Sequence, residues 1–187
     1  MIRKYDASSE IYDRRYVEIQ TQKYQNIFFP EKFENFRLLD AGCGTGLFLE
    51  YLCEKKIKKK DFTGFYIGID ISRGMISQFR SKIWSLPPDF RSKITLLVSD
   101  IDFLPFRNTI FDMIGSFTSL QNLPQIETGF KELIRVSAKK GLLFLSILNK
   151  QLDMGSIEAL MENKLKNIQI IQDPKLEDII IQAEKKD

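Results

Sequence analysis

Glycine occupies every second position where an apolar segment near the start of the chain gives way to a helix-like segment. Residues 38–46 read Leu-Leu-Asp-Ala-Gly-Cys-Gly-Thr-Gly, and the following Leu47–Leu52 suits a helix. Because glycine has no Cβ, a ligand can press against bare backbone at such a turn. A strand, a glycine turn and a helix in this order present free backbone N–H groups to a nucleotide-like ligand. The sequence therefore predicts a ligand site at the end of the first strand.

The spacing of these glycines differs from two common phosphate-binding motifs. The dinucleotide fingerprint G-x-G-x-x-G would place its third glycine at Leu47, and the Gly-Lys-Ser/Thr of a P-loop does not follow. Asp40 stands two residues before the first glycine, where an anion would repel a pyrophosphate and attract a cation. The turn therefore favours a ligand that carries an ammonium or sulfonium group over a dinucleotide.

Four segments resemble, in order, the motifs of the class I methyltransferases, which use S-adenosylmethionine. Asp40–Gly46 resembles motif I, Tyr66–Ser72 motif II, Val98–Phe106 motif III and Phe111–Thr118 motif IV. A lone glycine turn would be a weak signal, but four motifs in register are a specific one. The resemblance covers about residues 36–148. It implies a short, archaeal-type S-adenosylmethionine-dependent methyltransferase with a Rossmann-like fold.

The composition is that of one globular domain with a substantial core. The chain has 187 residues, of which 43% are hydrophobic and 28% charged. No apolar run approaches the roughly 20 residues that cross a bilayer, and the first residues lack the apolar stretch of a signal peptide. Cys43 and Cys53 have neither zinc spacing nor a disulfide framework. We therefore expect a cytoplasmic protein with no membrane association and no metal site.

The absence of histidine narrows the chemistry further. It excludes Ser-His-Asp and Cys-His nucleophile systems and most zinc catalysis, so any proton transfer must use a carboxylate, tyrosine, lysine or water. The net charge of +3 is too small to predict nucleic-acid binding without a local patch. Lys55–Lys60 contains five lysines, but it is more typical of a solvated helix end.

Strand-like and helix-like segments alternate along the chain, which indicates a parallel sheet covered on both faces. We expect a doubly wound, seven-stranded, mostly parallel sheet in a single α/β domain, closed by a C-terminal antiparallel hairpin around Asp173-Pro174-Lys175. A lid helix would occupy residues 1–30 and the methyltransferase domain residues 31–187. The expected strands are 36–40, 64–70, 94–99, 111–117, 142–148, 167–172 and 177–183, and the expected helices are 8–26, 46–59, 73–84, 125–137 and 153–165.

The resemblance also implies which residues bind the cofactor. Gly42, Gly44 and Gly46 would let its methionine and ribose portions approach the backbone. Asp70, at the end of the second strand, would accept hydrogen bonds from the ribose hydroxyls, although an acid at a strand end is often a helix cap. Ile71 would then pack on the adenine ring.

Further cofactor contacts come from three other segments. By resemblance, Asp100 would accept a hydrogen bond from the adenine amino group, with Asp102 as its rival, while the Ile101 N–H meets the ring. Asp40 would lie beside the cationic portion. In related enzymes a Tyr-Asp pair on an N-terminal helix covers the cofactor, and Tyr12 with Asp13 is the candidate here.

Motif IV departs from the Asn/Asp-Pro-Pro-Tyr/Phe of amine and amide methyltransferases. The chain carries Gly115–Asn122 instead, and Gln121-Asn122 stand where related small-molecule, quinone and tRNA-wobble enzymes often have histidines. The usual candidate base is therefore missing. Ser116 and Thr118 are the catalytic candidates, with Ser116 also near the cofactor methyl group, although either could simply satisfy backbone groups at a strand end.

The short chain leaves the methyl acceptor open. The acceptor could be small, or a partner could supply recognition of RNA or a translation-related macromolecule. Some RNA and translation-factor methyltransferases of this size work with a small zinc-binding activator that pairs along a sheet edge, and the segment Tyr16–Tyr24 resembles such enzymes. The alternatives are a small-molecule methyltransferase and a non-catalytic methyltransferase-like subunit. A nucleotide-dependent oxidoreductase is disfavoured by Leu47 and Asp40.

Overall fold

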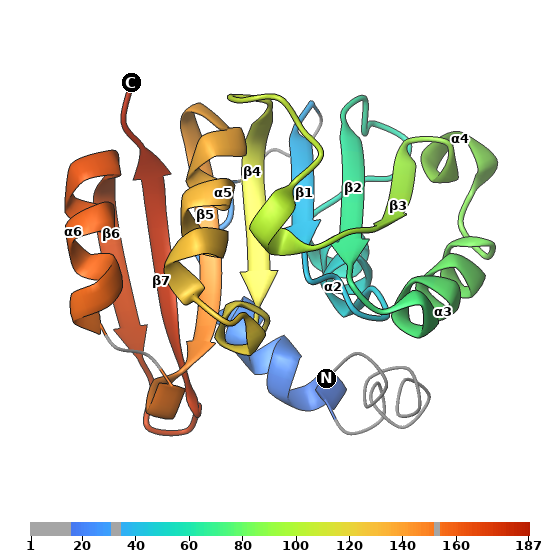
Figure 1. The fold of residues 1–187 in the computed structure, drawn as a ribbon. Coiled ribbons are helices and arrows are strands. Elements are labelled where there is room, and N and C mark those ends of the chain that lie inside the picture. Colours follow the sequence, from blue (N-terminus) through green and yellow to red (C-terminus); the bar gives the residue numbers. More distant parts are fainter. Residues whose placement is uncertain (1–15, 31–34, 152–153) are drawn as a thin grey trace.

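The fold is a seven-stranded sheet with helices on both faces (Figure 1). The computed structural model describes residues 16–30, 35–151 and 154–187. The strand order is β3-β2-β1-β4-β5-β7-β6, and only β7 runs against the others. The strands are β1 (Arg37–Ala41), β2 (Phe65–Asp70), β3 (Ile94–Val98), β4 (Phe111–Phe117), β5 (Ser137–Leu148), β6 (Leu165–Gln172) and β7 (Asp178–Lys185). The predicted doubly wound sheet and its closing hairpin are confirmed.

Two apolar cores lie on opposite faces of the sheet. In Figure 1, α5 and α6 lie in front of the sheet and α2 behind it. Phe48 and Phe79 belong to the core on the α2 and α3 side, and Phe130 and Leu133 to the core under α5. The helices are α2 (Leu47–Lys55), α3 (Arg73–Ile83), α4 (Pro88–Arg91), α5 (Ile126–Val136) and α6 (Met154–Lys164), with 3₁₀ turns η1 (Ile101–Phe103), η2 (Leu120–Asn122) and η3 (Asn149–Gln151).

Two expected boundaries differ in the structure. The helix expected over 46–59 ends at Lys55, because the N–H groups of Lys56 and Ile57 both turn back to the carbonyl of Leu52 and Ile57 enters the core. The strand expected to begin at residue 142 begins at Ser137 and carries an irregularity before Leu142, where Lys140 has φ 59°. Residues 138–141, between the expected helix and the expected strand, therefore form a bulge inside a longer strand.

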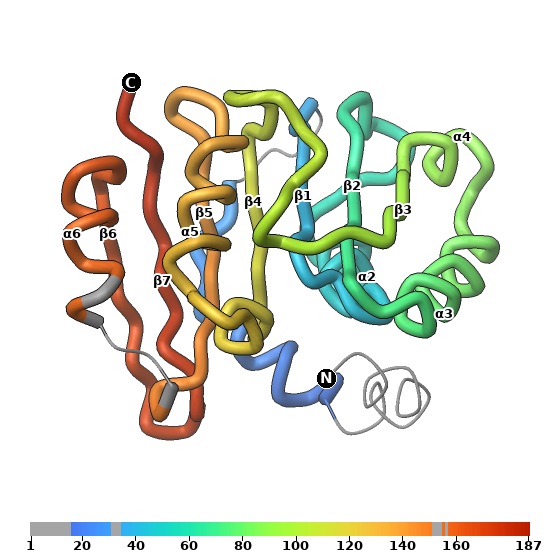
Figure 2. Tube along the Cα trace, viewed as in Figure 1, coloured from blue at the N-terminus to red at the C-terminus, as the bar shows by residue number. Residues whose placement is uncertain are grey.

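The carboxyl-terminal ends of the parallel strands lie along one edge of the sheet. Parallel pairing of β1 with β2 and β4 brings Ala41, Asp70 and Phe117 to that edge, and antiparallel pairing of Leu148 with Asp178 brings the start of β7 there. Figure 2 shows the helical residues 16–25 beside the tips of β4 and β5 at this edge, while the C-terminus lies at the opposite edge. We call it the carboxyl edge.

Within the described residues, none of the helices combines the length and the apolar character that crossing a membrane would demand.

Candidate functional site

The glycine turn is fastened to β2 by its own backbone. The N–H groups of Gly42 and Cys43 both donate to the carbonyl of Ile69 at 2.8 Å, and that of Gly46 donates to Cys43 at 3.0 Å. Gly42, Gly44 and Gly46 have φ values of 78°, 53° and 90°. These angles fall in the left-handed region that side chains disfavour, so the alternating glycines are a backbone requirement of this corner.

Two of the three glycines are also required by close packing within the protein. A Cβ on Gly42 would lie 2.0 Å from the Ser119 hydroxyl oxygen, and a Cβ on Gly46 would lie 2.3 Å from the Phe79 ring. Ser119 donates a hydrogen bond to the Gly42 carbonyl at 3.3 Å. The segment after β4 and helix α3 therefore approach the turn directly.

Asp70 is held at the tip of β2 by two backbone donors. Its carboxylate accepts hydrogen bonds from the Gly44 N–H at 2.9 Å and from the Ser72 N–H at 2.8 Å, one on each oxygen. Each carboxylate oxygen can accept more than one hydrogen bond, so Asp70 retains capacity for ligand hydroxyls. Ile71, the next residue, is 42% exposed although it is a large apolar side chain. A rigid acceptor thus lies next to an uncovered apolar surface.

The segment after β3 offers a second carboxylate. Asp100 accepts a hydrogen bond from the Asp102 N–H at 3.0 Å and so caps η1, while Ile101 is buried. One Asp102 carboxylate oxygen is buried and has no hydrogen-bond partner among the described residues. Burial, and then the charges of Asp100 and Glu132, raise the pKa of Asp102.

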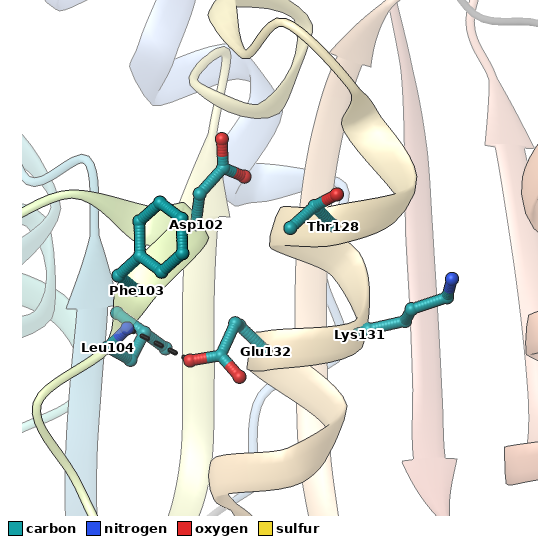
Figure 3. Close-up of a pocket in the computed structure, with 6 residues that line it drawn as sticks. All are labelled: Asp102, Phe103, Leu104, Thr128, Lys131 and Glu132. Carbon is teal, nitrogen blue, oxygen red and sulfur yellow. Dashed lines mark hydrogen bonds between the residues drawn. The ribbon is translucent and has the colours of Figure 1, made fainter.

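Asp102 lines an open pocket of about 500 Å³ between η1 and α5 (Figure 3). In Figure 3, Asp102, Phe103 and Leu104 lie on one side of the pocket and Thr128 and Glu132 on the other, while the Lys131 side chain points away. Glu132 accepts a hydrogen bond from the Leu104 N–H at 2.9 Å. This pocket does not include the glycine turn. Of the two rival acids, Asp100 therefore stays with the strand end and Asp102 belongs to the pocket.

Asp40 lies beneath the glycine turn rather than on its surface. It is 1% exposed, and the Tyr66 hydroxyl donates to its carboxylate. Burial raises the pKa of Asp40 to about 7, the hydrogen bond from Tyr66 opposes this shift, and the charge of Asp70 adds to it. The structure places Asp40 as a support of the turn, out of direct reach of a ligand.

The two catalytic candidates at motif IV are both engaged within the protein. Ser116 is fully buried and donates to the Ala41 carbonyl at 2.9 Å, which links β4 to β1. Thr118 has φ 55°, accepts a hydrogen bond from Lys23 Nζ at 2.6 Å and donates to Asp178 at 3.0 Å. Neither hydroxyl is arranged as an activated nucleophile or a free base.

Thr118 is the centre of a buried polar cluster that the sequence did not predict. We call Gln20, Lys23, Thr118, Ser146 and Asp178 the Thr118 cluster. Lys23 Nζ lies 2.8 Å from Asp178, and the two side chains are only 3% and 2% exposed. Burial lowers the pKa of Lys23, while the charge and hydrogen bond of Asp178 oppose that shift. The cluster fixes residues 16–25 to the carboxyl edge.

A weak sequence signal for this cluster existed. Gln20 and Lys23 lie three residues apart, and so on one face of a helix, and both are buried; Asp178 precedes three consecutive isoleucines. The predicted lid residue Tyr12 lies outside the described residues. Tyr24 packs in the core against Phe48 and Phe117, with ring centroids 5.2 and 4.8 Å away.

The donor and acceptor set fits an adenosyl group. Asp70 supplies an acceptor for sugar hydroxyls, the exposed Ile71 an apolar surface for a ring, and Asp100 an acceptor for an amino group. Gly44 adds backbone without a side chain at the same corner. These are the features that a nucleoside-type cofactor requires at the carboxyl edge of an open sheet.

Sequence comparison assigns this core to a known family. The family described as "Methyltransferase domain" matches residues 39–145. The malonyl-[acyl-carrier protein] O-methyltransferase of Geobacter sulfurreducens is 27% identical over 74% of this chain and 46% of its own length. The chain spans about half the length of the first curated relatives it matches.

Solved structures share the fold over almost the whole chain. A methyltransferase in complex with the Haloferax volcanii Trm112 methyltransferase activator has a TM-score of 0.71 at 16% identity, with 98% of both chains covered. Magnesium protoporphyrin IX methyltransferase from Synechocystis, solved with bound S-adenosylmethionine, has a TM-score of 0.63 at 17% identity, covering 94% of this chain and 78% of its own. At such identities the likeness is one of fold.

Proposed function

Because the chain belongs to the family of class I S-adenosylmethionine-dependent methyltransferases, we propose that it transfers a methyl group to an acceptor bound at the carboxyl edge of its sheet. The observation that carries this proposal is the Asp70 carboxylate, held by the N–H groups of Gly44 and Ser72 beside the exposed Ile71. A rigid carboxylate at this strand tip suits the ribose hydroxyls of the cofactor.

S-adenosylmethionine is the cofactor. Gly44, Asp70, Ile71, Asp100 and Ile101 would hold it, and Gly42, Gly46 and Asp40 would keep the turn in shape from beneath. When bound, the cofactor supplies a methyl group already activated by its sulfonium, so no covalent intermediate with the protein is needed. The protein therefore contributes mainly alignment of the acceptor. Ser116 and Thr118 position the segment after β4 through their hydrogen bonds.

The acceptor site would lie at the carboxyl edge beside residues 16–25, which contact the segment after β4 directly. Gln20 and Lys23 donate to Thr118 at 3.3 and 2.6 Å, which makes residues 16–25 a fixed wall at this side of the site. We therefore propose residues 1–30 as the cover of the site and residues 31–187 as the methyltransferase domain. Tyr12 belongs to this cover.

We propose RNA or a translation-related macromolecule as the acceptor. The segment between η1 and β4 and the segment between η2 and α5 are both short. Among the described residues, neither therefore forms a substrate-binding insertion at the carboxyl edge. A large acceptor can reach such an open edge, whereas a small one would need further walls. The relatives named malonyl-[acyl-carrier protein] O-methyltransferase and ubiquinone biosynthesis O-methyltransferase match this chain over only about half of their own length, so their acceptors are not carried over to it.

A small zinc-binding activator is the proposed partner. The chain matches the fold of the methyltransferase from the Haloferax volcanii activator complex over 98% of both chains. β3 is an edge strand, and Val98 at its end is 50% exposed. An unpaired edge with apolar side chains can accept a further strand from another protein. Co-expression with such an activator should raise the yield of soluble protein and give a single co-eluting peak in gel filtration.

Calorimetry and methyl transfer test the proposed function. The purified chain, alone and with the activator, should bind S-adenosylmethionine at one site. Labelled methyl groups should then pass from the cofactor into one fraction of a cell extract separated into RNA, protein and small molecules. Absence of cofactor binding in both samples would overturn the proposal. Label in the small-molecule fraction alone would overturn the macromolecular acceptor and leave methyl transfer standing.

A further inference from the structure

Helix α3 presents an exposed face that has no acidic residue. Arg73, Ser77, Arg80 and Trp84 are exposed and recur every three or four residues, so they share one side of the helix and its C-cap. None of the residues Arg73–Ile83 is Asp or Glu. Surface helices usually mix both signs of charge, so a face that carries cations alone creates a local positive potential.

The two arginines on this face are available to an anion. Across the parts of the chain that the structure describes, no acidic side chain forms an ion pair with Arg73 or Arg80. Lys82, on the same helix but turned toward α2, is instead paired with Glu50 at 3.3 Å. Arg73 is the first residue of the helix, where the helix dipole disfavours a cation. Folding stability alone gives no reason for a positive charge there.

Trp84 adds an aromatic platform at the far end of the face. It is the sole tryptophan of the chain, and it is 65% exposed. The guanidinium carbon of Arg91 lies 4.3 Å from its ring centroid, and Arg91 also donates to the Trp84 carbonyl at 3.1 Å. The indole is thus held in place on one side, while most of its surface remains open to solvent. An exposed aromatic ring beside arginine is typical of surfaces on which nucleobases stack.

The face leads to the proposed cofactor residues. Ser72, the N-cap of α3, donates its N–H to Asp70, so the helix begins beside the carboxylate at the tip of β2. Figure 1 shows α3 starting under the arrowhead of β2 and running outward toward the β3 side. The eleven residues of α3 span about 16 Å along the helix axis. An extended strand of only a few nucleotides would therefore reach from Trp84 to the cofactor end of the helix.

We propose that α3 binds a single-stranded segment of nucleic acid, with one base stacked on Trp84 and phosphates near Arg73 and Arg80. The stacking supplies affinity without base specificity, and the arginines orient the strand toward the carboxyl edge. This inference rests on the proposed function and narrows its macromolecular acceptor to nucleic acid. An acidic peptide would meet the arginines equally well, but it would leave the open surface of Trp84 without a stacking partner.

The tryptophan itself reports the binding. Titration of the purified full chain with a 12-nucleotide oligo(U) or oligo(dT) at low salt should quench Trp84 fluorescence, since no other indole contributes. The logarithm of the association constant should fall with the logarithm of salt by about 0.7 for each phosphate contacted. The two oligonucleotides distinguish RNA from DNA, and quenching by either supports the proposal. Absence of quenching by both, or equal quenching by polyglutamate, overturns it.

Variants separate stacking from general charge. With a labelled oligonucleotide followed by anisotropy, Trp84→Ala should weaken binding at least fivefold and Arg80→Glu about tenfold. The matched control is Lys139→Glu, which makes the same charge change at an exposed lysine on β5, near the opposite edge of the sheet. The control should stay within twofold of the unaltered chain. An equal loss in Lys139→Glu, or unchanged binding in Trp84→Ala, overturns the proposal.

Calorimetry with S-adenosylmethionine on the same samples keeps the two proposals apart. Arg80→Glu should bind the cofactor as the unaltered chain does, because Arg80 lies about two turns from the cofactor end of α3. Cofactor binding without oligonucleotide binding overturns this inference alone. Oligonucleotide binding without cofactor binding overturns the proposed function and leaves the nucleic-acid surface in place.

Discussion

The two halves of the carboxyl edge are built in different ways. In the half where we propose that the cofactor binds, the principal hydrogen bonds join residues close in sequence or on adjacent strands: Asp70 accepts from Ser72, and Asp100 from Asp102. In the Thr118 cluster, a helix near the start of the chain meets β4 and the last strand through Lys23, Thr118 and Asp178. The contacts of the first half therefore form mainly between residues near one another in sequence, whereas those of the second form only when distant segments meet in the folded sheet.

The two halves also differ in what stabilises their charged side chains. Asp70 is half-buried, and the backbone N–H groups of Gly44 and Ser72 hold its carboxylate. Lys23 and Asp178 are almost completely buried and depend on each other. Removing one member of a buried pair leaves an uncompensated charge, whereas a partly exposed carboxylate can be lost with little effect on folding. We therefore expect substitutions in the first half to change cofactor binding and substitutions in the second half to change stability.

The largest effect is expected from breaking the buried pair. Lys23→Met should lower the free energy of unfolding by about 3–5 kcal/mol, because Asp178 is then left buried without its cation. Denaturant titration measures the loss. The double variant Lys23→Met, Asp178→Leu should recover most of it, since neither charge remains. A single variant as stable as the unaltered chain would contradict the proposed dependence.

Asp70→Ala should weaken the binding of S-adenosylmethionine by about 2–4 kcal/mol and leave the chain folded, because charge-assisted hydrogen bonds to the ribose disappear. Calorimetry gives the affinity, and circular dichroism checks the fold. Asp89→Ala, at an exposed acid on α4, is the matched control. Unchanged affinity in Asp70→Ala would remove this residue from the cofactor site.

Gly42→Ala tests where the two halves meet. An added Cβ would lie 2.0 Å from the Ser119 hydroxyl oxygen, and φ of 78° is strained for alanine, so a loss of about 2 kcal/mol in unfolding free energy is expected. Combining it with Ser119→Gly should restore the part due to the clash and leave the backbone strain. If the double variant were no more stable than Gly42→Ala, the contact with Ser119 would not be the cause.

Per pH unit, the smallest change is expected from the titration of Asp40. Its pKa is raised from 3.8 to about 7, so the folded chain binds more protons than the unfolded chain between these values. Its contribution to stability is therefore full below pH 3.8 and is lost as pH rises through about 7, with a slope of at most about 1.4 kcal/mol per pH unit. Asp40→Asn should remove this slope from the unfolding free energy measured between pH 5 and 8. A slope that persists in the variant would assign it to another group.

Most of the fold could be predicted from local patterns. Alternation of apolar strands with amphipathic helices predicted the parallel sheet, and the short Asp173-Pro174-Lys175 connection predicted the final antiparallel pair. Boundaries set by tertiary contacts were less accurate: the bulge before Leu142 depends on how β5 pairs with β4. The periodic spacing of apolar residues indicates which face of a helix or strand is buried. It does not indicate at which residue the hydrogen bonding between two neighbouring strands begins or ends.

By itself, the sequence determined the family and the glycine corner, and it predicted that Asp70 and Asp100 stand at the ends of their strands. These features depend on backbone chirality and on the hydrogen bonds that an aspartate makes two residues along, both of which act within a short segment. Only the tertiary structure decided that Asp40 is buried beneath the glycine turn and that the Ser119 side chain packs directly against Gly42. It likewise decided that Lys23 and Asp178 form an ion pair. These contacts depend on sheet order and on layers packed across it, and residues far apart in the chain acquire their chemistry only when the core closes around them.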